Sequence, residues 1–198
     1  MILAESGSSD YGLAIRSAIR GLWGGKVDMA HFIDMMVVAM GRRLRQAWLE
    51  GAAQCGIQPD ELTPNETMRL AVEIQGMTTY IAPFAITIME NSKAKGGKLG
   101  PLLNRGQMWT ARYEQFKTMG QVTACADKKM EWVLGPTEHC SSCLKLNGKV
   151  KRASVWHDSG ILPRVAGASY LKCHGYRCQC SLIPSTKKAT SGPFPNLP

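Results

Sequence analysis

Apolar residues recur at helical spacing through the first half of the chain. Between Tyr11 and Trp23 the apolar positions are Leu13, Ile15, Ala18, Ile19 and Leu22, and Gly24-Gly25 end the pattern. From about Val27 to Ala53 the same spacing holds for Ile33, Met36, Val37, Met40, Leu44, Ala47 and Trp48. Both stretches therefore predict amphipathic helices with one buried face.

A third helix is predicted to begin at Thr63. This residue can cap a helix, Pro64 suits the first helical position, and Glu66 completes a capping box. The buried face is predicted to carry Leu70, Ile74, Met77, Ile81, Phe84 or Ala85, and Ile88. Pro83 falls inside this pattern and is expected to kink the helix or to divide it in two.

The pattern stops at residues 93–106, where glycine, proline and lysine predict a flexible linker without a packed element. A connecting helix over 107–131 follows, with Trp109, Tyr113, Phe116 and Met119 on one face. We expect 132–184 to form an irregular module with short strands around Lys149–Val155 and Ser181–Ile183. Residues 185–198 are rich in Ser, Thr, Lys, Gly and Pro and predict a flexible tail. With 1–92 helical, the fold class is mainly α, followed by a small α+β module.

Composition restricts the class of protein. The chain has 198 residues, 44% of them hydrophobic, which is enough to bury a core. No apolar run reaches the length of a membrane span, so no membrane partner is expected. The first residues show no secretory signal pattern, and the seven cysteines are odd in number. Both features favour reduced thiols in a cytosol, and metal binding over disulfides.

Charge is divided unevenly along the chain. Residues 1–92 carry seven Lys/Arg and ten Asp/Glu, a balance of −3, whereas residues 93–198 carry seventeen and five, a balance of +12. A basic C-terminal half suggests a polyanion or an acidic protein surface as its partner, although lysines around a small domain also serve solubility.

Cysteine spacing gives the strongest chemical signal. Cys140 and Cys143 form a C-x-x-C pair, and a second cluster with Cys173, Cys178 and Cys180 lies about thirty residues later. Such spacings are typical of a tetrahedral zinc site that serves as a structural scaffold, with disulfides or reactive thiols as alternatives. We expect zinc to be bound by Cys140, Cys143, Cys173 and Cys178, with Cys180 and His174 as substitutes for the last two.

Enzyme classes fit the sequence poorly. A zinc deaminase needs an H-x-E motif, which the chain lacks, and Glu138-His139-Cys140 has the wrong order. His157-Asp158 alone does not make a metal-dependent nuclease of the HNH type, and the helical pattern before Cys140 does not suit a thioredoxin-like fold. We therefore expect no catalytic activity.

The main alternative is a nucleic-acid-binding zinc module. Its candidate phosphate contacts are Lys145, Lys149, Lys151, Arg152, Lys172 and Arg177.

Read as one string, residues 132–182 resemble the C-terminal module of the phage Mu F-like head morphogenesis family. The features are Trp132, the C-x-x-C pair, the turn over 146–150 with sequence Leu-Asn-Gly-Lys-Val, then Trp156, Pro163 and the closing Cys178-Gln179-Cys180. The helix before the module also matches, so the resemblance covers about 105–184. Where many relatives have His-Pro-Asn before the closing cysteines, this chain has Cys173-His174-Gly175-Tyr176.

The resemblance implies a minor head protein (minor capsid protein), a structural component of the virion without catalytic activity. It implies portal or connector and capsid proteins as partners, with packaged DNA as a further candidate. We expect a homo-oligomeric assembly of many copies in the phage head or neck, formed in the host cytoplasm.

Overall fold

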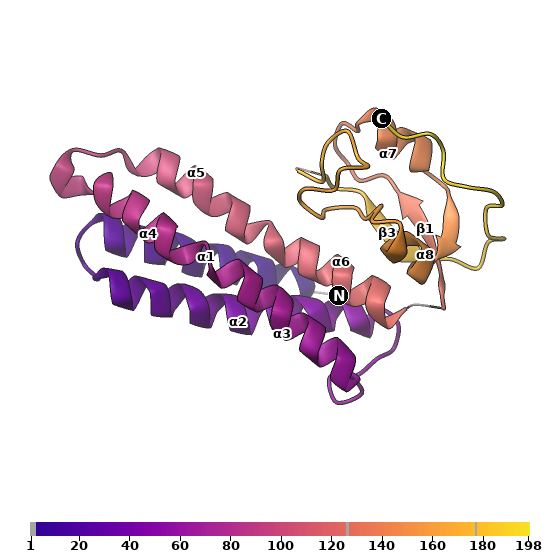
Figure 1. The fold of residues 1–198 in the computed structure, drawn as a ribbon, viewed down its shortest axis with the longest axis horizontal. Helices are drawn as coiled ribbons and strands as arrows, with labels where there is room; N and C mark the ends of the chain where they lie inside the picture. Colours follow the sequence, from indigo (N-terminus) through magenta and orange to yellow (C-terminus); the bar gives the residue numbers. More distant parts are fainter. Residues whose placement is uncertain (1–2, 126, 177) are drawn as a thin grey trace. The chain divides into compact units, whose positions relative to one another are not determined.

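The computed structural model describes residues 3–125, 127–176 and 178–198, and its fold is mainly α, as the hydrophobic pattern predicts. Figure 1 shows long helices in the first half of the chain and a small sheet near its C-terminus. The helices before the sheet are α1 (Leu3–Trp23), α2 (Met29–Ala53), α3 (Pro64–Thr78), α4 (Ile81–Glu90), the 3-10 turn η1 (Lys93–Lys95), α5 (Leu99–Thr110) and α6 (Arg112–Ala124). The remaining elements are β1 (Lys129–Val133), α7 (Ser141–Leu146), β2 (Val150–Arg152), α8 (Ala153–Asp158) and β3 (Ser181–Pro184).

The chain divides into two compact units. The helical unit contains the described residues up to Ala47 together with Leu62–Tyr113, and the C-terminal unit contains Trp48–Glu61 and Glu114–Pro198. The predicted boundaries at 92 and 106 are not unit boundaries. The end of α2, from Trp48 to Ala53, belongs to the C-terminal unit, whereas the sequence predicts it as part of the helical region.

The helical unit has an aromatic core. Phe84 of α4 lies between Phe32 of α2, with ring centroids 6.3 Å apart, and Trp109 of α5, with centroids 6.4 Å apart. Helix α1 packs on both α4 and α5. Most predicted core positions are buried, but Leu13 of α1 and Val37 of α2 are exposed (55% and 40%), and the buried stripe of α2 includes Phe32.

The predicted capping box at the start of α3 is confirmed. The backbone N–H of Glu66 donates to Thr63 Oγ1 over 3.2 Å, and the backbone N–H of Thr63 donates to the Glu66 carboxylate over 2.8 Å. The break near Pro83 is also confirmed, because α3 ends at Thr78 and Pro83 lies in the first turn of α4.

We expect Thr63→Ala to destabilise the helical unit by about 1 kcal/mol, because it removes the side-chain acceptor of the Glu66 amide. Thermal unfolding followed by circular dichroism measures this change. Thr67→Ala makes the same substitution at an exposed position inside α3 and is expected to leave the midpoint unchanged. Equal midpoints for both variants would show that the capping box adds no stability.

The predicted linker is wrong over most of its length. Residues 93–95 form η1 and residues 99–106 lie in α5, where Leu102 is buried. Pro101 is in the first turn, which tolerates proline. Gly106 is a point of close approach, since a Cβ there would press on the Ile19 side chain. Burial against α1 therefore overrides the weak helix propensity of this stretch.

The predicted connecting helix over 107–131 is also wrong at both ends. Helices α5 and α6 are separate, and the chain leaves α6 at Ala124 and becomes strand β1 at Lys129. In β1, Glu131 pairs with Val150 of β2 and Trp132 pairs with Leu182 of β3, both antiparallel, so the sheet order is β2-β1-β3. The expected strand at Ser181–Ile183 is present, whereas the strand expected over Lys149–Val155 is limited to Val150–Arg152, because helix α8 begins at Ala153.

In the C-terminal unit the end of α2 lies directly against α6. A Cβ at Gly51 would overlap the Lys117 carbonyl, and one at Gly120 would overlap the Trp48 carbonyl, so the two backbones can meet only at glycine. Cys55 and Cys125 join the ends of these helices in a disulfide. The expectation of reduced thiols is therefore wrong for this pair, and the other five cysteines are free.

The predicted tail packs on the cysteine-rich module. Thr190 exchanges hydrogen bonds with the backbone of Val150, donating its amide N–H over 2.7 Å and accepting through its hydroxyl over 3.0 Å. The ring of Phe194 lies 4.9 Å from that of Trp156, and Leu197 also packs against the core. Composition alone predicts a free tail here, but two apolar side chains attach it.

Candidate metal centre

Cys140 and Cys143 lie at the start of α7. Cys140 is the N-cap residue, and its carbonyl accepts the Leu144 amide N–H over 3.1 Å. Three positions later along one helical turn, Cys143 points to the same side, and the two Sγ atoms are 3.5 Å apart. This is the geometry that the C-x-x-C spacing predicts.

The other three cysteines lie on a loop that leads into β3. His174 and Gly175 both have positive φ angles, 49° and 72°, so the chain turns sharply after Cys173. At Gly175 a Cβ would overlap the Val165 carbonyl, and only glycine fits. Cys178 and Cys180 follow this turn, and Cys180 directly precedes β3.

Among the described residues, the five thiols form two groups that share Cys143. One group contains Cys140, Cys143 and Cys173, the other contains Cys143, Cys178 and Cys180, and the sulfurs within each group lie within 4.8 Å of one another. A cluster of this kind can hold a metal ion. The sequence identified all five cysteines, but their division into two groups was not predicted.

The cluster is set against an apolar core. Cys143 and Cys180 are nearly inaccessible, whereas Cys140, Cys173 and Cys178 are half-buried. Trp132, Leu146 and Trp156 are completely buried in the same core, and the rings of the two tryptophans are 5.6 Å apart. Sulfur ligands held by packed residues suit a site that stabilises the fold.

The thiols perturb one another's proton binding. Hydrogen bonds from Cys143 and Cys180 lower the pKa of Cys178 to about 2, whereas the neighbouring thiols Cys178 and Cys180 raise the pKa of Cys143 above its usual range. Burial raises the pKa of Cys173 to about 11. Because adjacent thiolates repel, only some of the five can ionise at neutral pH without a cation, and a bound metal would stabilise them all.

His139 is a further polar group at the cluster that sequence reasoning missed as a ligand. Its Nδ1 lies 3.7 Å from Cys180 Sγ, and its Nε2 lies 3.0 Å from the carbonyl oxygen of Gly135. With Nε2 donating to the Gly135 carbonyl, Nδ1 is the nitrogen that faces Cys180 and can bind a metal. His174, which we had expected as a substitute ligand, is exposed and belongs to neither group of thiols.

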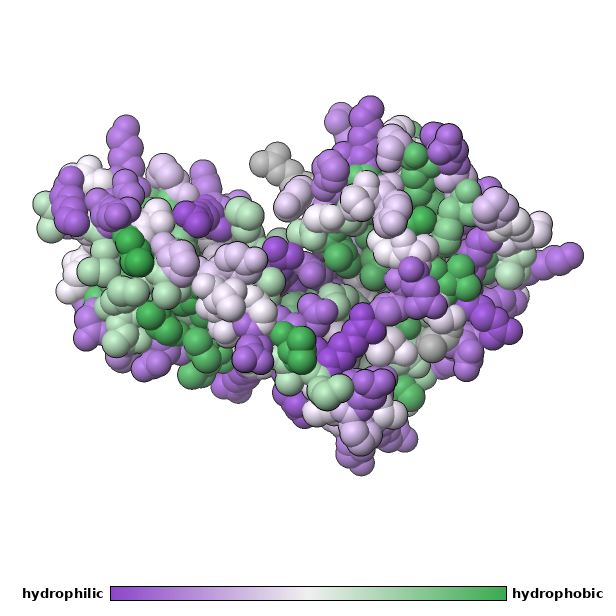
Figure 2. Space-filling model, viewed as in Figure 1, coloured by the Kyte–Doolittle hydropathy of each residue, from purple (hydrophilic) through white to green (hydrophobic). Residues whose placement is uncertain are grey.

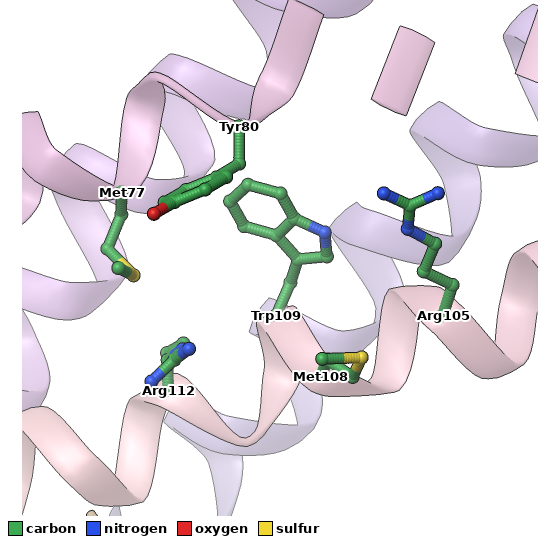
Figure 3. A pocket seen from close by; sticks show the side chains of 6 residues that line it. All are labelled: Met77, Tyr80, Arg105, Met108, Trp109 and Arg112. Atoms are coloured by element: carbon green, nitrogen blue, oxygen red, sulfur yellow. The ribbon is translucent and has the colours of Figure 1, made fainter. Parts of the chain in front are cut away.

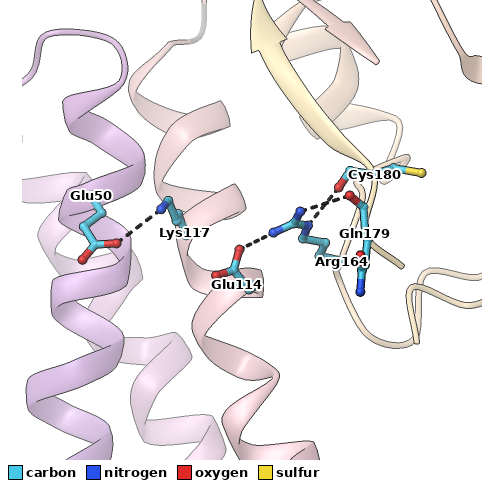
Figure 4. A network of polar contacts seen from close by, with 6 residues as sticks. All are labelled: Glu50, Glu114, Lys117, Arg164, Gln179 and Cys180. Carbon is cyan, nitrogen blue, oxygen red and sulfur yellow. Dashed lines mark hydrogen bonds and ion pairs between the residues drawn. The ribbon is translucent and has the colours of Figure 1, made fainter. Parts of the chain in front are cut away.

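Arg164 holds the closing cysteines in place (Figure 4). Its Nε donates to the carbonyl of Cys180 over 2.9 Å, and its Nη2 donates to the carbonyl of Gln179 over 3.0 Å. The same guanidinium forms an ion pair with Glu114 of α6. No local motif marks Arg164, because its partners are backbone carbonyls fifteen and sixteen residues away and a carboxylate fifty residues away.

We expect Arg164→Ala to weaken metal binding about 10- to 100-fold, the usual effect of losing a group that orients a metal ligand. Competition with a chromophoric chelator measures the affinity of the purified protein. Arg152→Ala is the matched control, since Arg152 is exposed and its guanidinium bonds to Asp127 instead. If both variants bound the metal as tightly as the parent protein, Arg164 would have no role in positioning the cysteines.

Several candidate phosphate-binding residues already bond to the chain itself. Lys145 donates to the Asn196 carbonyl over 2.8 Å, Lys151 donates to the Thr190 carbonyl over 2.8 Å, and Arg152 donates to the Asp127 carbonyl over 3.0 Å. Lys172 is exposed, Lys149 is half-buried, and Arg177 lies outside the described residues. Three of the six candidates thus have carbonyl partners within the protein.

The helical unit has a small surface pocket of about 190 Å³. Its lining residues, drawn in Figure 3, are Met77, Tyr80, Arg105, Met108, Trp109 and Arg112. This volume is below the roughly 300–1,000 Å³ of typical ligand sites. Figure 2 shows other apolar side chains on the visible surface among polar ones, in line with the partial exposure of Ile86 and Met89. The cysteine cluster remains the stronger candidate site.

Comparisons with protein-family models, curated proteins and solved structures find no match to this chain. The resemblance to phage head morphogenesis proteins therefore depends on the motif residues themselves. Within the described part of the chain, no helix has the length and hydrophobicity needed to cross a bilayer.

Proposed function

We propose that this protein is a non-enzymatic structural component of a phage virion, a minor head protein whose C-terminal module folds around zinc. It would act in many copies at the portal, connector or capsid, in the head or neck of the particle. The observation that carries this proposal is that the motif residues of the resemblance form one folded module.

Residues of the motif that are far apart in the sequence contact one another in the structure. The amide N–H of Gly148 donates to the carbonyl of Trp132 over 2.9 Å, and the amide N–H of Trp132 donates to the carbonyl of Lys149 over 3.0 Å. Gly148 has a φ of 73°, which favours glycine in the turn. Trp132, Trp156 and Pro163 are all buried. Each feature therefore has a structural reason to recur in proteins of this kind, which supports a shared fold.

The donor set favours zinc with a structural role. Thiolate ligands select zinc over hard cations, and sites with four protein ligands, such as four cysteines or three cysteines and a histidine, are closed, whereas catalytic zinc sites keep one position open for water. The five thiols of this module provide such a set. This ligand chemistry supports a zinc site that stabilises the fold and not one that catalyses a reaction.

The charge division supports the choice of partners. The balance of −3 over residues 1–92 and +12 over residues 93–198 suits a protein that lies between a protein ring and packaged DNA. Such contacts would be independent of DNA sequence, since lysine and arginine neutralise phosphates without reading bases.

Cys140→Ser in the phage that encodes the protein tests the proposal. We expect the variant to lose head association, because the module cannot fold around its metal, while the helical unit stays folded. Cys55→Ser is the control, since Cys55 lies outside both thiol groups. Incorporation of Cys140→Ser into infectious particles at the parental level would contradict a docking role for the module.

A nucleic-acid-binding zinc module is the second candidate, supported by the excess of basic residues after residue 92. It is weaker because Lys145, Lys151 and Arg152 already bond to carbonyls of the chain. Binding of the purified protein to short DNA duplexes with a steep salt dependence would favour it. Specific retention on portal or capsid protein would favour the virion role.

A further inference from the structure

The module holds five free cysteine thiols, although a tetrahedral ion uses only four ligands. Around a single zinc with Zn–S bonds of about 2.3 Å, all four sulfurs lie roughly 3.8 Å apart and form one mutually close set. The described thiols form two sets of three instead, and Cys143 is their only common member. This is the arrangement of two metal positions that share one ligand.

Charge also favours two ions. One Zn²⁺ bound by four thiolates leaves a balance of −2 with the fifth thiol protonated, whereas two Zn²⁺ bound by all five thiolates leave −1. Cys143 and Cys180 are only 2% and 1% exposed, and uncompensated charge is costly at buried positions. A second cation would therefore stabilise the ionised cluster more effectively than solvent can.

Each set has a means of completing four ligands. At the set formed by Cys143, Cys178 and Cys180, His139 places Nδ1 3.7 Å from Cys180 Sγ, and its Nε2 lies 3.0 Å from the carbonyl of Gly135. Metal-binding histidines commonly use such a hydrogen bond on the second nitrogen to fix the ring. At the other set, Cys140 and Cys173 are half-buried, so water can reach the fourth position.

We propose that the module binds two zinc ions bridged by the Cys143 thiolate. One ion is held by Cys140, Cys143 and Cys173, and the other by Cys143, Cys178, Cys180 and His139. This inference rests on the proposed zinc-binding role of the module, but it is separable from it by stoichiometry.

Native mass spectrometry and elemental analysis of the full-length protein, purified without chelator and titrated with zinc, test the proposal. We expect two zinc ions per chain. One ion per chain, unchanged by excess zinc, would overturn the two-ion site and leave the zinc-bound module standing. A chain that binds none would overturn both.

The role of His139 has its own test. His139→Ala is expected to weaken the binding of the ion held by Cys143, Cys178 and Cys180, because that ion would keep its three thiolates and lose its fourth protein ligand. The matched control His174→Ala is expected to keep the parental affinity for both ions, because His174 is exposed, whereas His139 Nδ1 lies 3.7 Å from Cys180 Sγ. Titration with cobalt in competition with a chelator measures the affinity for each equivalent through thiolate-to-metal absorption. Parental affinity for both equivalents in His139→Ala would overturn the assignment of His139.

Discussion

Cys143→Ser is expected to abolish metal binding and to unfold the C-terminal module. Cys143 is the only thiol that belongs to both groups, and it is 2% exposed. A serine hydroxyl does not replace a zinc-bound thiolate, and structural zinc contributes about 10–16 kcal/mol to the folding of small modules in peptide systems. This loss exceeds the stability of a typical domain.

Zinc content and limited proteolysis measure this outcome together. Residues 132–184 should become protease-sensitive in Cys143→Ser while the helical unit remains resistant. Cys55→Ser makes the same substitution at the Cys55–Cys125 disulfide and should retain its zinc. If Cys143→Ser kept the parental zinc content, the shared position of Cys143 would have no bearing on metal binding.

Trp156→Ala is expected to have the second largest effect, a destabilisation of the C-terminal unit by about 3–5 kcal/mol. The Trp156 side chain is completely buried, and its indole N–H donates to the carbonyl of Met130 over 3.1 Å. Its ring packs between those of Trp132 and Phe194, with centroids 5.6 and 4.9 Å away. The substitution would leave a cavity next to β1 and detach the C-terminal segment.

Chemical denaturation of the metal-loaded protein measures this change. Tyr176→Ala is the control, because Tyr176 is an aromatic residue of the same module with 55% of its surface exposed, and it should change stability by less than about 0.5 kcal/mol. A Trp156→Ala variant as stable as this control would show that the aromatic cluster does not support the module.

Sequence motifs predicted the structure correctly where the interacting residues are only a few positions apart. The capping box at Thr63 and the C-x-x-C turn at Cys140 involve partners three residues apart, and both are present. The prediction for residues 93–106 was wrong because burial of Leu102 against other helices outweighs the glycines. Strand β1 was missed because its pairing partners lie nineteen or more residues away.

The metal centre was likewise predicted only where residues close in the sequence decide the structure. Spacing identified the cysteines, but only the folded loop determines which thiols are close to one another. Sequence reasoning considered His174 because of its neighbours in the chain, whereas the nearby histidine is His139, fixed by the carbonyl of Gly135. Arg164 bonds to backbone carbonyls, which leave no trace in the sequence.

X-ray absorption at the zinc edge determines whether the cysteine cluster holds zinc through its thiolates. Protein purified without chelator is expected to contain zinc, with a first shell dominated by sulfur at about 2.3 Å. Protein without zinc, a shell of oxygen and nitrogen alone, or a disulfide between Cys140 and Cys143 would contradict this expectation.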